Sequence, residues 1–78
     1  MIQSSNAFTA AKSARFARIQ AKYYHAMIRK WRKLEQENPD LGIAAWNIVF
    51  YRKMARRWES IARSQEKIVR AFAALAMN

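Results

Sequence analysis

The sequence contains no cysteine, one glycine and one proline among its 78 residues. The absence of cysteine excludes a disulfide framework and a thiolate metal site. A single glycine and a single proline provide too little turn material for an all-β fold, a glycine-rich phosphate loop or a collagen-like repeat. Because a chain of this length has room for one domain, we expect residues 1–78 to form a single helical domain.

Acidic residues are also scarce, since five Asp and Glu stand against 15 Lys and Arg and leave a formal net charge of +10. Residues 1–34 contain no acid at all. Hydrophobic residues make up 53% of the chain, which excludes a disordered basic tail. Glu59 and Glu66 precede Arg63 and Arg70 by four residues, and this order predicts two ion pairs within one helix.

No long hydrophobic run is present. The longest uncharged segments, residues 1–11 and 41–51, are 11 residues each, whereas a membrane-spanning helix needs about 20. We therefore expect no integral membrane association. The first 20 residues have the composition of a mitochondrial transit peptide, but the same basic character continues to the end of the chain. We expect a cytoplasmic location, in a bacterial or phage-infected cell.

One turn-like segment, residues 37–42, interrupts a sequence that otherwise favours helix. It holds the only proline, which disfavours helical backbone angles at Asn38. We predict a helix from about residue 5 to 37, a turn over 38–41 and a helix from about 40 to 77, beginning at Pro39 or Asp40. A short connection makes two helices antiparallel neighbours. The predicted fold is all-α, a long antiparallel helical hairpin.

The second predicted helix follows a heptad pattern. With Trp58 at position a, the d sites are Asn47, Met54, Ile61, Ile68 and Leu75. The e sites are also apolar and widen the pattern into a bundle face. On the first helix the a sites are Ala10, Ala17, Tyr24 and Trp31. We expect the a and d sites to form the seam, with Trp31, Tyr51, Met54 and Trp58 in the core and Asn47 and Gln65 as buried polar residues that set the register.

Large apolar residues exceed what a seam between two helices can cover, and contiguous exposed apolar surface indicates an interface. We therefore expect two hairpins to dimerise into a four-helix bundle. The residues assigned to this dimer or partner interface are Phe16, Ile19, Tyr23, Trp46, Val49, Phe50 and Trp58. The alternative is a three-helix monomer, in which the first helix breaks before Ala21 and folds back.

Side chains suited to catalysis are few. His25 is the only histidine, and the nearest carboxylate in sequence is ten residues away, so only Glu59 or Glu66 on the other helix could pair with it. No Glu-x-x-His pair is present for a di-metal bundle, and the serines lack a nucleophile-elbow context. We expect no catalytic residue, no metal site and no cofactor, and hence no enzyme activity.

The basic residues fall mainly away from the predicted seam and form a cationic ridge along each helix. Such ridges can neutralise phosphates, and arginine in particular binds phosphate through two parallel hydrogen bonds. We assign nucleic-acid binding to twelve of them: Arg15, Arg18, Lys22, Arg29, Lys30, Arg32, Lys33, Arg52, Lys53, Arg56, Arg57 and Arg63.

The leading interpretation is a small basic, non-enzymatic binding protein that engages a polyanion, most directly nucleic acid through its phosphate backbone. No helix-turn-helix, zinc-finger or RNA-recognition motif is present, so we do not expect sequence-specific reading of bases. The alternative is an adaptor or inhibitor of the phage or mobile-element type that docks on an acidic protein surface through Ile43, Trp46, Val49, Phe50 and Lys53. A minor alternative is a cationic membrane-active helical protein.

Overall fold

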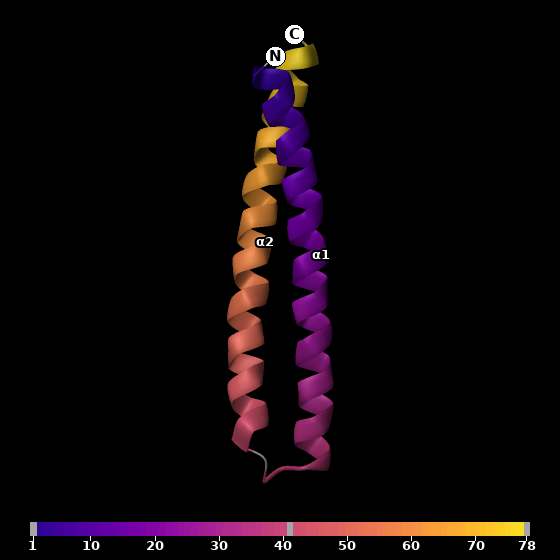
Figure 1. Ribbon diagram of the computed structural model, residues 1–78, viewed down its shortest axis with the longest axis vertical. Coiled ribbons are helices and arrows are strands. Elements are labelled where there is room, and N and C mark those ends of the chain that lie inside the picture. The colour runs from indigo at the N-terminus through magenta and orange to yellow at the C-terminus, as the bar shows by residue number, and fades with distance from the viewer. Residues whose placement is uncertain (1, 41, 78) are drawn as a thin grey trace.

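The computed structural model of the chain contains two α-helices, α1 from Ile2 to Glu37 and α2 from Gly42 to Met77. It describes the backbone of residues 2–40 and 42–77, and the side chains of residues 8–40 and 42–77. The helices run antiparallel and side by side, so that the start of α1 and the end of α2 lie at the same end of the hairpin (Figure 1). The predicted all-α hairpin is confirmed.

The helix ends differ slightly from those predicted. α1 begins at Ile2 rather than near residue 5, and α2 begins at Gly42 rather than at Pro39 or Asp40, which lie in the turn. Position 41 of the predicted turn lies outside the described residues. α1 ends where the backbone N–H of Asn38 donates to the carbonyl of Leu34 at 2.8 Å, because the following proline disfavours a helical Asn38.

The continuity of α1 tests the predicted alternative, a three-helix monomer. α1 extends without interruption from Ile2 to Glu37 and does not break before Ala21. The three-helix alternative is therefore wrong. The reason is local, since this stretch contains neither glycine nor proline and is rich in alanine, arginine and lysine, which favour helix.

The two helices meet along a seam of small side chains. The buried apolar residues are Ala10, Ala14, Ala17, Ala21, Ile28, Ala44, Ile48, Ala55 and Ala62. Ala17, Ala44 and Ala62 have no exposed surface at all. Because the separation of packed helices depends on the side chains at their contact, alanine lets the backbones approach closely. We call this contact the alanine seam.

The alanine seam uses heptad positions a and e, which corrects the predicted seam at a and d. At the d sites Ile61, Ile68 and Leu75 the exposed fraction is 37%, 39% and 67%, whereas the e sites Ala55 and Ala62 are buried. The contact is centred on the smallest side chains, and this rotation moves the bulky d residues from the middle of the contact to its edge.

The large residues predicted to fill the core are only half-buried, and the same holds for the two polar residues predicted to be buried. This set comprises Trp31, Tyr51, Met54, Trp58, Asn47 and Gln65. In the described part of the chain no buried polar residue is found and no large side chain is fully enclosed. Close packing of the helices on alanine is again the reason, because the space between two helices in contact through alanine is too narrow to surround an indole ring.

The hairpin is a thin rod of 59 × 18 × 13 Å with a radius of gyration of 17.5 Å. A compact domain of this length has a radius of gyration of about 11.5 Å. The accessible surface of 6343 Å² also exceeds the value of about 4,900 Å² typical of a compact monomer of this mass. Much of the apolar surface of the hairpin is therefore left uncovered.

Candidate nucleic-acid interface

The alanine seam separates two long flanks of the hairpin. Because the helices are antiparallel and face each other through the same heptad positions, the b and f sites of both helices fall on one flank and the d and g sites on the other. The polar flank holds, at b and f, Arg15, Arg18, Lys22, His25, Arg29, Arg32, Arg52, Arg56, Glu59, Arg63, Glu66 and Arg70. The aromatic flank holds, at d and g, Phe16, Tyr23, Met27, Leu34, Phe50, Met54, Ile61, Ile68 and Leu75.

On the polar flank, Arg18 of α1 binds Glu66 of α2 through two hydrogen bonds. Nε donates to Oε2 at 2.9 Å and Nη2 donates to Oε1 at 2.7 Å. These hydrogen bonds lower the pKa of Glu66 below its ordinary value and raise the pKa of Arg18, and partial desolvation opposes both shifts. Arg18 is one of the twelve residues assigned to nucleic acid, and its guanidinium group is engaged by Glu66 in this pair. Its role in nucleic-acid binding stays a prediction.

Seven residues closer to the turn on each helix, His25 lies opposite Glu59. Its Nε2–H donates to Glu59 Oε1 at 2.7 Å. The sequence had limited the partners of His25 to Glu59 and Glu66, and the structure selects Glu59. Both carboxylates thus bond across the hairpin, whereas the sequence predicted pairs with Arg63 and Arg70 within α2.

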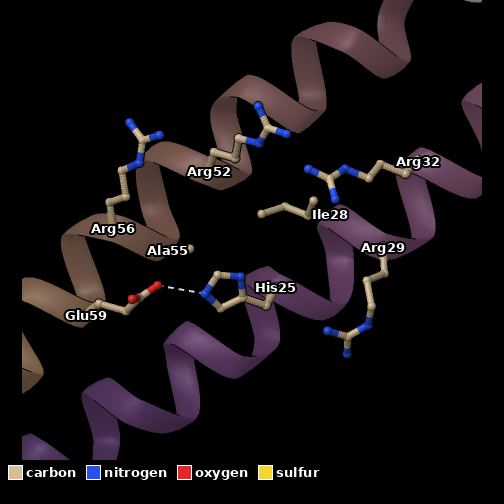
Figure 2. A pocket seen from close by; sticks show the side chains of 8 residues that line it. All are labelled: His25, Ile28, Arg29, Arg32, Arg52, Ala55, Arg56 and Glu59. Carbon is tan, nitrogen blue, oxygen red and sulfur yellow. Dashed lines mark hydrogen bonds and ion pairs between the residues drawn. The ribbon is translucent and has the colours of Figure 1, made fainter.

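A further seven residues toward the turn, the equivalent positions are both arginines, Arg32 on α1 and Arg52 on α2. Figure 2 shows the two guanidinium groups extending toward one another across the space between the helices. Within the described side chains, neither arginine has a carboxylate partner within 4 Å. The three equivalent levels of the polar flank, which we call rungs, are therefore Arg–Glu, His–Glu and Arg–Arg.

The third rung lies over a cleft of about 460 Å³ between the helices. The two arginines of the rung line this cleft together with His25 and Glu59. Arg29 and Arg56 also line it, but their guanidinium groups extend outward, away from the opposite helix (Figure 2). Its apolar lining residues, Ile28 and Ala55, are buried. A second cleft of about 390 Å³ shares Arg32 and Arg52 and also includes Glu35. Arg32 and Arg52 thus line both clefts.

The other bases assigned to nucleic acid are exposed but do not all share this flank. Arg15, Lys22 and Arg63 lie on the polar flank. Lys30 and Arg57 occupy g sites on the aromatic flank, in register with Tyr23 and Phe50. Lys33 and Lys53 occupy c sites, on the outer side of their helices. The structure gathers four assigned arginines around the cleft and distributes the rest.

Aromatic rings follow the opposite flank in two contact groups. Phe16 of α1 contacts Trp58 of α2 edge to face, with ring centroids 5.5 Å apart. Tyr24 contacts both Tyr23 on α1 and Tyr51 on α2, and Phe50 contacts Tyr51. More than half of the surface of Phe16, Tyr23 and Phe50 remains exposed. These residues belong to the predicted interface, whose role as an interface stays a prediction.

Three other residues of the predicted interface lie elsewhere. Trp46 and Ile19 are at outward c sites and Val49 is on the side of the polar flank, with exposed fractions of 79%, 57% and 55%. Trp46 and Val49 line a shallow apolar depression of about 240 Å³ near the turn. Ile43, also exposed, is close by in sequence at the start of α2. The predicted interface is therefore not one continuous patch.

The described residues include no group of three or more His, Asp or Glu side chains that could hold a metal ion. Neither α1 nor α2, over the same part of the chain, has a stretch both long and apolar enough to cross a bilayer. The prediction that the protein is not an enzyme stays a prediction.

Sequence reasoning found the individual bases but not the Arg–Arg rung. That rung depends on which residues of the two helices lie opposite each other, and this register requires the exact ends of the turn. A signal was present in the sequence, because Arg18, His25 and Arg32 are spaced by seven, as are Arg52, Glu59 and Glu66. Reading these two series in opposite directions gives the three rungs.

No protein family is matched by the chain, and neither curated proteins nor solved structures include a significant match to it.

Proposed function

We propose that the protein is a small non-enzymatic binding protein that engages the phosphate backbone of nucleic acid with its polar flank. The observation that supports this function is the excess of one sign of charge on that flank. Nine Lys and Arg side chains occupy its b and f sites against two carboxylates, and both carboxylates are already bonded across the hairpin. A flank that only needed to be hydrated would mix both signs.

The dimensions of the polar flank suit several phosphate contacts. From Arg15 to Arg32 the helix advances about 26 Å at 1.5 Å per residue. Duplex DNA carries one negative charge per about 1.7 Å of axis, so more phosphates than cations lie along this length. With about five phosphates neutralised, the affinity falls by about 10²–10³-fold between 50 and 200 mM salt.

The test compares two double variants with the same change in net charge. Arg29→Glu with Arg56→Glu alters the polar flank, and Lys30→Glu with Arg57→Glu alters the next residue of each helix, on the aromatic flank. We expect the first variant to weaken binding of a labelled 20-nucleotide duplex or single strand at least about tenfold more than the second, because direct phosphate contacts are lost. Fluorescence anisotropy at 50 and 200 mM salt measures this. Equal losses, or no binding by the unaltered protein at 50 mM salt, would overturn the proposal.

We also propose that the aromatic flank pairs with that of a second copy, giving the four-helix bundle. The support is the uncovered apolar surface described above, together with the exposed d sites Ile61, Ile68 and Leu75. Salt screens repulsion between two chains of charge +10, so dimerisation should strengthen with salt while nucleic-acid binding weakens. Sedimentation equilibrium at the same two salt concentrations tests this, and a monomer at both would contradict it.

A protein-directed adaptor or inhibitor is the second candidate function. Its support is the depression near the turn, where Trp46 is 79% exposed beside Val49. Exposed tryptophan is typical of residues that dominate binding between proteins. A nuclease-treated pull-down tests this candidate: a stoichiometric partner that is lost with Trp46→Ala, and kept with Arg29→Glu and Arg56→Glu, would favour it over nucleic-acid binding.

A further inference from the structure

We propose that Arg32 and Arg52 form a two-helix clamp for a single phosphate oxyanion at the third rung of the polar flank. The inference rests on the proposed function, since it names the point at which a backbone phosphodiester would be held. The same chemistry would also hold free phosphate, and the experiments below separate these two sources.

The first argument is the exception within a regular pattern. At two of three equivalent rungs a base on α1 faces a carboxylate on α2, with contacts of 2.7 Å. At the third rung two permanent cations face each other. Like charges placed opposite one another destabilise a helix pair, and a carboxylate at position 52 would remove the repulsion. An anion bound between Arg32 and Arg52 would complete the pattern of opposite charges.

The second argument is the shape of the cleft. The guanidinium groups of Arg32 and Arg52 extend toward one another from opposite helices, while those of Arg29 and Arg56, which also line the cleft, extend outward (Figure 2). A volume of about 460 Å³ accommodates a phosphate group with several waters, since one water occupies about 30 Å³. Planar guanidinium groups bind phosphate oxygens through paired, charge-assisted hydrogen bonds.

The third argument is the local balance of charge. Two carboxylates adjoin the rung: Glu59 lines the larger cleft and Glu35 lines the neighbouring one. Glu59 is bonded to His25, which lines the same cleft. Glu59 is thus already engaged by His25, and among the described side chains no carboxylate lies within 4 Å of Arg32 or Arg52. The buried apolar residues Ile28 and Ala55 line the same cleft, whereas the side chains of Arg32 and Arg52 are exposed and free to meet an anion from solution.

A clamp of this kind has a consequence for the fold. A phosphate held by one arginine from each helix links α1 to α2 near the turn. A ligand that binds the folded hairpin and not the unfolded chain stabilises the hairpin. Inorganic phosphate should therefore raise the thermal unfolding midpoint of the full chain more than chloride at the same ionic strength.

The direct test is a titration of the full chain with inorganic phosphate, followed by NMR of the arginine side-chain Nε–Hε groups at constant ionic strength. We expect saturable shifts at Arg32 and Arg52, with a midpoint of about 1–10 mM. Arg52→Gln should abolish the saturable shift at Arg32. The matched control Arg57→Gln removes the same charge five residues away and should leave that shift unchanged. Small, non-saturating shifts of equal size at Arg32, Arg52 and Arg57 would overturn the clamp.

A second variant, Arg52→Glu, avoids the ambiguity of a variant that fails to fold. It places a carboxylate opposite Arg32 and converts the third rung into an Arg–Glu pair. We expect the thermal midpoint without phosphate to rise by about 2–4 °C and the extra stabilisation by phosphate to disappear. A variant still stabilised by phosphate as strongly as the unaltered protein would contradict the clamp.

Failure of the clamp and failure of the proposed function give different results. Saturable phosphate binding without any binding of a 20-nucleotide oligonucleotide would support the clamp for free phosphate and overturn nucleic-acid binding. The oligonucleotide can also be tested against two double variants, Arg32→Gln with Arg52→Gln and Lys30→Gln with Arg57→Gln. If the first variant weakens oligonucleotide binding no more than the second, the clamp is overturned and the proposed function still stands. If both are correct, the first pair should cost about tenfold more affinity than the second.

Discussion

The polar and aromatic flanks border the same alanine seam, yet they use side chains for different purposes. On the polar flank, Arg18 contacts Glu66 through two hydrogen bonds and His25 contacts Glu59 through one, all between partly exposed groups. On the aromatic flank, Phe16 and Trp58 pack edge to face and cover part of each other. Exposed ion pairs contribute little free energy, whereas aromatic pairs contribute more through burial. The polar flank therefore adds little stability, and the seam and the aromatic flank supply most of it.

The largest expected effect comes from the seam, which both flanks require. Ala62 has no exposed surface, so Ala62→Leu should force the helices apart and lower the free energy of unfolding by about 2–3 kcal/mol. The matched control is Ala74→Leu on the exposed side of α2, which should change it by less than about 0.5 kcal/mol. Urea unfolding followed by circular dichroism measures both. Similar values for the two variants would mean that the seam is wrongly located.

A smaller effect is expected on the aromatic flank. Trp58 is half-buried, and its Nε1 is enclosed without a hydrogen-bond acceptor, so Trp58→Ala removes apolar contacts but no hydrogen bond. We expect a loss of about 1–2 kcal/mol, below the 3–5 kcal/mol typical of a fully buried tryptophan. Trp46→Ala deletes the same side chain where it is 79% exposed and should have almost no effect. If both variants unfolded at the same urea concentration, the aromatic contact would contribute nothing.

The smallest expected effect is the pH dependence of the polar flank. The pKa of Glu66 is lowered by its hydrogen bonds to Arg18, so this pair stabilises the folded chain above the ordinary glutamate value of 4.5. That contribution should be lost as the pH falls below 4.5 and through the lowered pKa. Glu66→Gln should flatten this part of the curve of unfolding midpoint against pH. If the unfolding midpoint of the variant fell as steeply in acid as that of the unaltered protein, the pH dependence would come from other carboxylates.

Much of the fold could be predicted from the sequence because its determinants are local. The segment around Pro39 marks the turn, and the absence of glycine and proline elsewhere predicts two long helices. The centre of the seam was harder to predict, since positions a, d and e are all apolar on α2 except for Asn47 and Gln65. Hydrophobicity favoured Ile61 and Ile68, whereas close packing selected Ala55 and Ala62.

For the candidate site, the sequence predicted only which types of residue it would contain. The sequence indicated many arginines on outward faces, and it could not show that Arg32 and Arg52 lie on the same rung. Register between two helices depends on the turn and on the fit along the whole seam. A slip of one helical turn would place Arg32 opposite Arg56 or Ile48 instead, with the same heptad pattern on each helix.

The sequence by itself determined an all-helical hairpin with a net charge of +10 and too few acids to neutralise it. Helical periodicity and charge are properties of each segment alone, so they can be derived without knowing the partner segment. Only the tertiary structure decided which acids are used across the hairpin and that Arg32 and Arg52 meet without one. The reason is that two antiparallel helices have several nearly equivalent registers, and the packing of the alanine seam selects among them.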